Sequence, residues 1–151
     1  MRDKRFIAEH RGGPLQKEQH YRLMNLACSY AEHVLASVSK DVDERLYRAL
    51  RVAIDWTKGN ATVGDARKAS LGAIAFAHES TNLTDIAVAR AVGHAVATAH
   101  MADHSLGAAY YALKAVKSAG KSVEEERKWQ DEQLPEELRE LFLSARILRK
   151  V

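Results

Sequence analysis

The sequence is poor in the features that tie a chain to an oxidising or membrane environment. Cys28 is the single cysteine among 151 residues, so no internal disulfide can form. No run approaches the roughly 18 apolar residues of a bilayer span. The charged N-terminus builds no apolar stretch typical of a secretory signal. We therefore expect a protein of the reducing cytoplasm that has no membrane partner.

The sequence also has no cluster of basic residues of the kind that binds nucleic acid. The formal net charge is only +3, and lysine and arginine are dispersed among aspartate and glutamate. Because nucleic-acid-binding proteins gather basic residues into a patch or stripe, no nucleic-acid partner is expected. The hydrophobic fraction of 46% and the charged fraction of 28% are typical of a soluble globular protein. The length suffices for one domain with its own core.

Helical periodicity dominates the sequence. Apolar residues recur at three- and four-residue spacing, and no stretch alternates at period two for long enough to predict a strand. Thr62, Asn82 and Ser122 each precede an acidic residue by three positions, a pattern that caps helix N-termini. Gly59 and Gly120 can end helices. The sequence predicts an all-α, single-domain bundle of five to seven helices, near residues 16–38, 42–58, 63–80, 83–118, 123–133 and 135–149.

The predicted helix 83–118 is too long for a compact fold. At 1.5 Å per residue it would span about 54 Å, whereas a chain of this size has a radius of gyration of about 15 Å. We expect a break within 101–105, with Asp103 or Ser105 as the new N-cap. Segment 86–99 is apolar nearly all round and rich in alanine and glycine, which predicts a central helix. Residues 1–15 are expected to form an N-terminal arm, and residues 16–151 the α-helical domain.

His100, Asp103 and His104 form the most informative part of the chain. On a helical wheel these polar residues share one face with small residues, so a neighbouring helix could approach closely. We interpret them as a buried hydrogen-bond network in the core. The small residues of that face are Ala89, Gly93, Ala97 and Gly107.

A metal site is the alternative for the same residues. His100 and His104 have the i, i+4 spacing with which one helix presents two imidazoles to a metal. With Asp103 the order resembles the inverted zincin motif His-x-x-Glu-His. A metal-dependent hydrolase that uses these three residues therefore stays open. His94 lies about 120° away on the wheel and could join the cluster in space.

The segment His10-Arg11-Gly12-Gly13 has the chemistry of a loop. Arg11 beside two glycines could hold a carboxylate in a fork while the backbone bends closely around it. That carboxylate could belong to this chain or to a partner. We expect such a fork to pin the N-terminal arm.

No catalytic constellation emerges from the rest of the chain. No serine lies in a nucleophile elbow, no phosphate-binding loop is present, and Cys28 lies on an apolar helix as expected of a core residue. We therefore expect neither enzyme activity nor a cofactor. Trp129 is expected to anchor helix packing, whereas Tyr110 and Arg127 have the residue types that anchor protein interfaces.

Six segments spread over the chain match a known pattern. They are 9–15 (EHRGGPL), 32–35 (EHVL), 56–67, 95–104 (AVATAHMADH), 111–116 (YALKAV) and 125–136. Together they resemble the helical "putative immunity protein" family of bacterial polymorphic-toxin systems, an immunity-five-like group. The resemblance covers nearly the whole chain, and residues 97–104 are its most specific part.

The resemblance implies a small bacterial cytoplasmic protein that binds and neutralises a cognate toxin domain by stoichiometric occlusion. A nuclease target is disfavoured, since inhibitors of nuclease toxins tend to be acidic and this chain carries a net charge of +3. A homo-oligomeric helical module is a further alternative. The candidate structural and interaction residues are His10, Arg11, Gly12, Gly13, His94, His100, Asp103, His104, Tyr110, Tyr111, Arg127 and Trp129.

Overall fold

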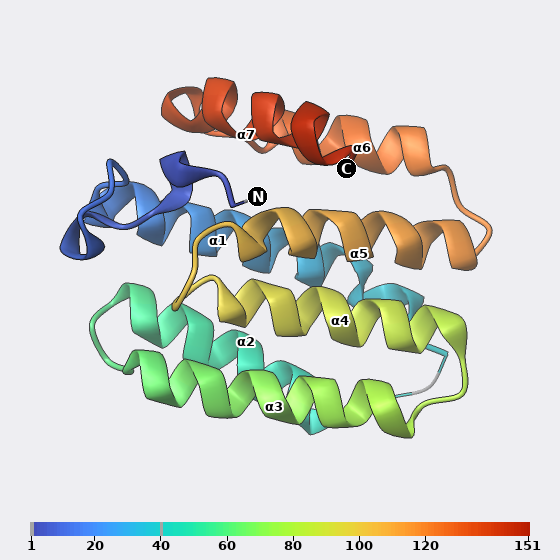
Figure 1. The fold of residues 1–151 in the computed structure, drawn as a ribbon. Coiled ribbons are helices and arrows are strands. Elements are labelled where there is room, and N and C mark those ends of the chain that lie inside the picture. The colour runs from blue at the N-terminus through green and yellow to red at the C-terminus, as the bar shows by residue number, and fades with distance from the viewer. Residues whose placement is uncertain (1, 40) are drawn as a thin grey trace.

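The computed structural model describes residues 2–39 and 41–151, and within these ranges the fold is entirely helical (Figure 1). Strand pairing in the same residues is limited to one isolated bridge between Ala8 and Leu15. The predicted all-α, single-domain bundle is confirmed. Its helices are α1 (Lys17–Val34), α2 (Glu44–Thr57), α3 (Val63–Glu79), α4 (Leu83–Ala97), α5 (His104–Ser118), α6 (Val123–Glu132) and α7 (Glu136–Arg149), with short 3-10 helices at Lys4–Phe6, Glu9–Arg11 and Leu35–Ser37.

Helices begin where capping residues were predicted, because their side chains satisfy backbone N–H groups that have no partner in the helix. At α3 the arrangement is reciprocal: the Asp65 N–H donates to the Thr62 hydroxyl (3.0 Å), and the Thr62 N–H donates to the Asp65 carboxylate (2.9 Å). At α4 only one half of this arrangement is present: the Asp85 N–H donates to the Asn82 side chain at 3.1 Å. Gly59 and Gly120 follow the ends of α2 and α5 at φ values of 77° and 76°, which favour glycine.

Helix α4 occupies the centre of the bundle, as predicted. It contacts α1, α2, α3 and α5, and most of its residues are buried. In Figure 1 it runs between α3 and α5, while α6 and α7 lie on the opposite side of α5. The alanine and glycine residues of α4 let these neighbours come close. Among the described residues, none of the helices combines the length and apolarity that a bilayer crossing requires.

Large apolar side chains fill the space between α1, α6 and α7. Tyr30 and Phe142 are fully buried and contact each other edge to face. The Tyr30 hydroxyl donates to the Gln130 carbonyl at 2.8 Å, which satisfies its buried polar atom. Cys28 is also buried on α1, and burial raises the pKa of its thiol to about 12. Cys28 is therefore the core residue that the sequence predicted.

Buried apolar side chains and arginine contacts hold residues 2–15 against the bundle. Phe6 and Leu15 are almost fully buried. Arg5 pairs with Asp3 and donates to the Ser144 hydroxyl of α7 at 2.7 Å. Arg11 forms no carboxylate fork within the chain: its side chain is exposed, and among residues 2–39 and 41–151 it has no carboxylate partner. A fork to a carboxylate of a partner stays a prediction.

The loop His10-Arg11-Gly12-Gly13 forms a tight turn for backbone reasons. Gly12 has a φ of 85°, which side chains disfavour. The N–H of Gly13 donates to the Ala8 carbonyl at 3.0 Å. A Cβ atom on Gly13 would overlap the Ile7 carbonyl. His10 and Arg11 lie on the exposed outside of this turn.

The long predicted helix breaks, and it does so over residues 98–103, slightly earlier than expected. Asp103 holds the N-cap position of α5 but makes no capping hydrogen bond with its side chain. Ser105 is not a cap either, since it lies in the first turn of α5 and donates to the Ala102 carbonyl at 2.7 Å. The carboxylate of Asp103 is used elsewhere.

Candidate functional site

The break between α4 and α5 brings the histidines together. Backbone N–H groups of Thr98, Ala99 and His100 donate to carbonyls three residues back, so the end of α4 tightens into a turn. The chain then reverses into α5. His94 lies one helical turn before the end of α4, and His104 is the first residue of α5, so the two side chains meet across the reversal.

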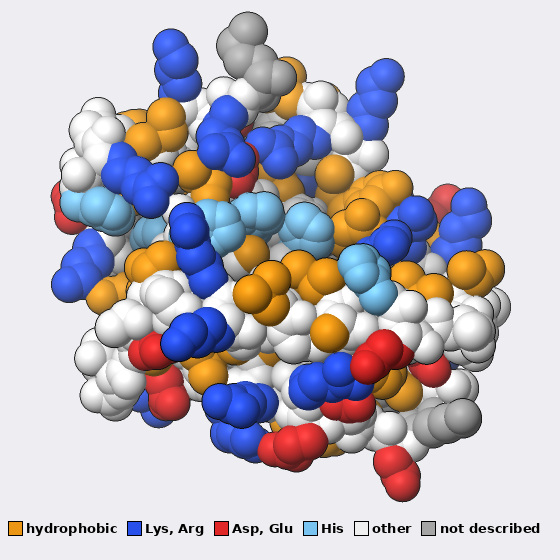
Figure 2. Space-filling view, turned by 60° about the horizontal axis from the view of Figure 1, so that its bottom comes forward, with side chains coloured by type: hydrophobic (Ala, Val, Ile, Leu, Met, Phe, Trp, Pro, Cys, Tyr) orange, Lys and Arg blue, Asp and Glu red, His pale blue; other side chains and the backbone are white. Residues whose placement is uncertain are grey.

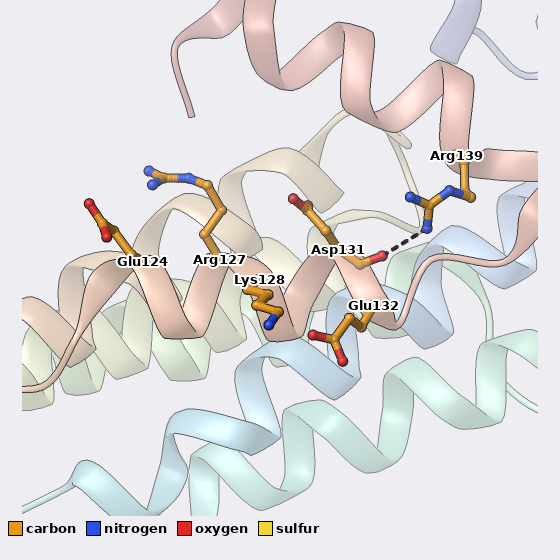
Figure 3. A pocket seen from close by; sticks show the side chains of 6 residues that line it. All are labelled: Glu124, Arg127, Lys128, Asp131, Glu132 and Arg139. Carbon is orange, nitrogen blue, oxygen red and sulfur yellow. Dashed lines mark hydrogen bonds between the residues drawn. The ribbon is translucent and has the colours of Figure 1, made fainter.

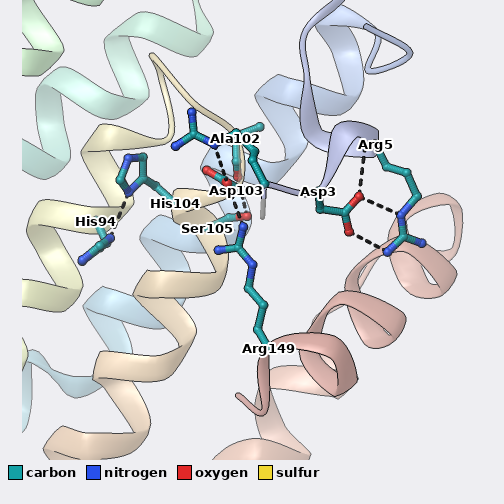
Figure 4. Close-up of polar contacts among 9 residues, drawn as sticks. Asp3, Arg5, His94, Ala102, Asp103, His104, Ser105 and Arg149 are labelled. Carbon is teal, nitrogen blue, oxygen red and sulfur yellow. Dashed lines mark hydrogen bonds and ion pairs between the residues drawn. The ribbon is translucent and has the colours of Figure 1, made fainter.

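His94 and His104 share a hydrogen bond between their Nδ1 atoms, 3.0 Å apart (Figure 4). One ring must donate its Nδ1–H and the other must accept it, so the two rings hold different tautomers when both are neutral. The His94 ring also stacks on Tyr111, with ring centroids 5.1 Å apart. His100 lies beside His104 at 5.0 Å between centroids.

Gly107 makes room for this pair. A Cβ atom at this position would overlap the His94 ring. Glycine lowers the helix propensity of α5 at position 107, but it leaves the space that the His94 ring occupies.

A groove of about 350 Å³ runs along α4 between α3 and α5. Gly93 and Ala97 of α4 form its apolar base, together with Ile74 and Ala77 of α3. Polar side chains from all three helices and the α4–α5 turn complete the lining: Ser70, His78, Arg90, His94, His100, His104 and Tyr111. Figure 2 shows histidine side chains in a row across one face, with lysine and arginine on both sides.

A second pocket, of about 430 Å³, continues the groove, because His94 and His104 line both. At its side Asp103 is 4% exposed and accepts two charged hydrogen bonds on one oxygen, from Arg2 Nε (3.2 Å) and from Arg149 Nη2 (2.8 Å). The N-terminal segment and the end of α7 are thereby joined to the start of α5 (Figure 4). We call both pockets together the histidine groove.

The histidine groove is electropositive without relying on its imidazoles. Three guanidinium groups, from Arg2, Arg90 and Arg149, line it against the single carboxylate of Asp103. Burial is the main cause that lowers the pKa values of His94 and His100, and it lowers that of His104 to about 4. The imidazoles are therefore neutral near pH 7.

The predicted network of His100, Asp103 and His104 needs correction. Asp103 is buried as expected, but its hydrogen-bond partners are Arg2 and Arg149 and not the two histidines. The partner of His104 is His94, which the helical wheel placed apart. The wheel was wrong here because it assumed one unbroken helix from 83 to 118. Asp103 and His104 still line the same pocket.

The described side chains near His100, Asp103 and His104 do not form a suitable set of metal ligands. Within the described residues, no three histidine, cysteine, aspartate or glutamate side chains converge in a way that could hold a metal ion. One oxygen of Asp103 is already occupied by two guanidinium groups. We therefore derive no chemistry through a metal.

The remaining candidates lie at the edge of the groove and on α6. Tyr110 is 38% exposed on α5 and contacts Tyr111 edge to face, which places it at the edge of the groove. Trp129 of α6 stacks on His33 of α1 with ring centroids 3.5 Å apart, and His33 also bonds to the buried Glu126 at 2.8 Å. Trp129 thus anchors helix packing, in agreement with its predicted role.

Arg127 belongs to a shallow charged pocket between α6 and α7, shown in Figure 3. Its lining contains both signs of charge, and Arg139 donates to the Asp131 carbonyl at 3.2 Å. Beneath it the buried Arg146 donates to the Gln130 side chain at 2.8 Å. These contacts hold α6 to α7, so this pocket has a structural explanation.

Sequence reasoning missed Arg2 and Arg149 as site residues. Each lies far along the chain from Asp103, by 101 and 46 positions. No local spacing links such residues. The one available signal was a negative one, since Asp103 has no lysine or arginine at helical spacing on its own segment.

A sequence model of one family matches residues 13–137, and its description is "Imm-5 like putative immunity protein". The match spans most of the chain, including all of α1 to α6. The chain belongs to this family, as the resemblance of its segments predicted. No curated protein and no solved structure shows significant similarity to it.

Proposed function

We propose that this protein is the immunity partner of a bacterial toxin domain, which it binds one to one in the cytoplasm and blocks by covering its surface. Membership of the immunity family over residues 13–137 is the observation that carries this proposal. It needs no catalytic group, no cofactor, no nucleic acid and no membrane. The metal-dependent hydrolase is disfavoured, because Asp103 is bound to Arg2 and Arg149.

The fold suits inhibition by binding. Buried side chains and capped helix ends give a preformed surface, so little conformational entropy is lost on association. A stable inhibitory interface buries about 1,200–2,000 Å² in total and draws most of its affinity from a few tyrosine, tryptophan or arginine anchors. Tyr110, 38% exposed beside the histidine groove, is the first such anchor to change.

Co-expression tests the proposal directly. The candidate toxin is the product of the gene next to the one that encodes this chain, expressed from an inducible promoter in a heterologous cell. We expect that product to stop growth alone, and growth to recover when this protein is present. The purified pair should elute as a one-to-one complex in size-exclusion chromatography with light scattering.

Two outcomes contradict the proposal. The neighbouring product could be harmless by itself, or it could stop growth equally in the presence of this protein. A chain that forms only complexes with itself in the same chromatography would favour the homo-oligomeric module instead.

A further inference from the structure

We infer that the histidine groove receives a carboxylate side chain, glutamate or aspartate, from the protein partner. The assignment rests on the proposed function, since it gives the chemistry of the toxin's contact residue. The charge, the free donors and the shape of the groove support it.

Charge is the first argument. Two of the three guanidinium groups, those of Arg2 and Arg149, meet at Asp103, and one carboxylate neutralises only one of them. Arg90 is exposed on α4 and has no carboxylate partner among the residues that the structure describes. The groove thus keeps an excess of positive charge even with every imidazole neutral, and it favours an anionic occupant.

Orientation is the second argument. The Arg90 guanidinium lies over the Tyr111 ring, 5.8 Å from its centroid, and the same ring stacks on His94. A guanidinium held against an aromatic face keeps its N–H edges free for a planar, bidentate partner such as a carboxylate. Arg90 is therefore positioned without having its donors consumed.

The tautomers of the histidine pair supply a further donor. In the bond between Nδ1 of His94 and Nδ1 of His104, the accepting ring has no hydrogen on Nδ1. When neutral, that ring must carry its hydrogen on Nε2. The pair therefore presents one Nε2–H donor that is not used in the bond between the two rings. An arriving carboxylate can accept from it, and its negative charge would also favour protonation of the pair.

The size and shape of the groove favour a protein side chain over a larger ligand. A volume of about 350 Å³ over an apolar base has room for one or two side chains. The stem of a glutamate can pack on Gly93, Ala97 and Ile74 while its carboxylate reaches Arg90. A nucleic-acid backbone would need a continuous basic track, whereas the net charge is only +3.

The groove also predicts how pH acts on binding. Because a bound carboxylate raises the affinity of neighbouring imidazoles for protons, the complex should take up protons and tighten as the pH falls from 7.5 to 6. The ionisable groups around the pair are His78 of α3, Arg90 of α4, His100 and Asp103 of the turn, Tyr111 of α5, Arg2 and Arg149. Arg67 of α3 and Arg11 of the N-terminal segment act on His100 beside the pair.

The first experiment is independent of the toxin. The full chain is titrated with the blocked peptide acetyl-Ala-Leu-Glu-Leu-Ala-amide, and the imidazole Cε1–H resonances are followed by nuclear magnetic resonance. We expect the His94 and His104 resonances to shift with the glutamate peptide and at least tenfold less with the glutamine counterpart. Arg90→Glu should abolish the shift. Arg48→Glu is the matched control, because Arg48 is exposed on α2 and lines a different pocket.

Equal shifts with both peptides, no shift at millimolar concentrations, or equal loss in both variants would overturn the inference. A single-stranded oligonucleotide that shifts the same resonances at lower concentration than the glutamate peptide would also overturn it, in favour of a phosphate ligand.

The second experiment uses the toxin. We expect Arg90→Glu to weaken the complex at least tenfold by calorimetry, and Arg48→Glu to leave it unchanged. If the toxin binds the parent and Arg90→Glu equally, the groove is not the contact, although the immunity function stands. If the parent binds no toxin, the immunity function fails and the peptide titration alone decides whether the groove binds carboxylates.

Discussion

His94 and His104 face each other across the reversal between α4 and α5, with their Nδ1 atoms 3.0 Å apart. A bond between two neutral imidazoles works only while one donates and the other accepts. If both rings were protonated, both Nδ1 atoms would carry hydrogens and the bond would be lost. The pair therefore couples protonation to the geometry of the site.

Acid should destabilise the protein in a defined range. Burial lowers the pKa values of His20, His94 and His100 below 6.5, and that of His104 to about 4. The unfolded chain then binds more protons, so the stability that these groups contribute is present above pH 6.5 and is lost as the pH falls toward 4. His104 has the most strongly lowered pKa of these histidines and should contribute the largest share of this loss.

Urea unfolding at a series of pH values measures this loss. His104→Gln should flatten the dependence between pH 6.5 and 4. An unfolding midpoint that stays constant over that range in the parent protein would contradict the lowered pKa values.

Gly107→Ala should destabilise the protein even though alanine favours helices by about 1 kcal/mol. The added Cβ atom would overlap the His94 ring, so the bond to His104 must break or α5 must move. Gly93→Ala is the matched control, because a Cβ atom there meets only Ile74 and Ala73 at the ordinary distances of 3.7 and 3.8 Å. Chemical denaturation should show Gly107→Ala below the parent and Gly93→Ala at or above it. The reverse order would show that His94 is not confined at this position.

Asp103→Ala should lower the melting temperature clearly. It leaves Arg2 and Arg149 without their shared carboxylate, and it removes a buried group that accepts two charged hydrogen bonds. We expect a loss of about 1–3 kcal/mol, since both arginines remain partly solvated. Arg149→Gln should cost less, because Arg2 keeps its bond to Asp103. Calorimetric melting of both variants tests this order, and an Asp103→Ala variant that melts like the parent would refute it.

Arg11→Lys should leave the N-terminal segment as resistant to proteolysis as the parent. The side chain of Arg11 is exposed, and apolar burial holds the segment instead. Phe6→Ala should expose residues 2–15 to cleavage before the helices unfold, because Phe6 is 1% exposed in the core. Limited proteolysis with mass spectrometry distinguishes the two variants. Faster cleavage in Arg11→Lys would restore the carboxylate fork inferred from the loop chemistry.

The helices could be predicted because their signals are local. The caps at Thr62 and Asn82 act within three residues, and the glycines that end α2 and α5 act through their own φ angles. The central position of α4 was predictable from residues 86–99 because they are apolar nearly all round, and a helix buried on every side carries almost no polar residue.

The site was only partly predictable. His94, His100, Asp103 and His104 were singled out from their residue types, and all lie in or beside the histidine groove. Their partners were not predictable. A helical wheel cannot describe residues on opposite sides of a chain reversal, and the turn at 98–103 placed His94 against His104.

The sequence by itself therefore determined the helical class, the helix ends, the central position of α4 and the segment that carries the site, because each depends on residues within one or two helical turns. Only the tertiary structure decided which charges meet. Asp103 pairs with Arg2 and Arg149 across 101 and 46 positions, and such contacts exist only once packing has brought the N-terminal segment and α7 to the start of α5. Because Coulombic interactions depend on distance in space and not on distance along the chain, no local sequence pattern could have predicted these ion pairs.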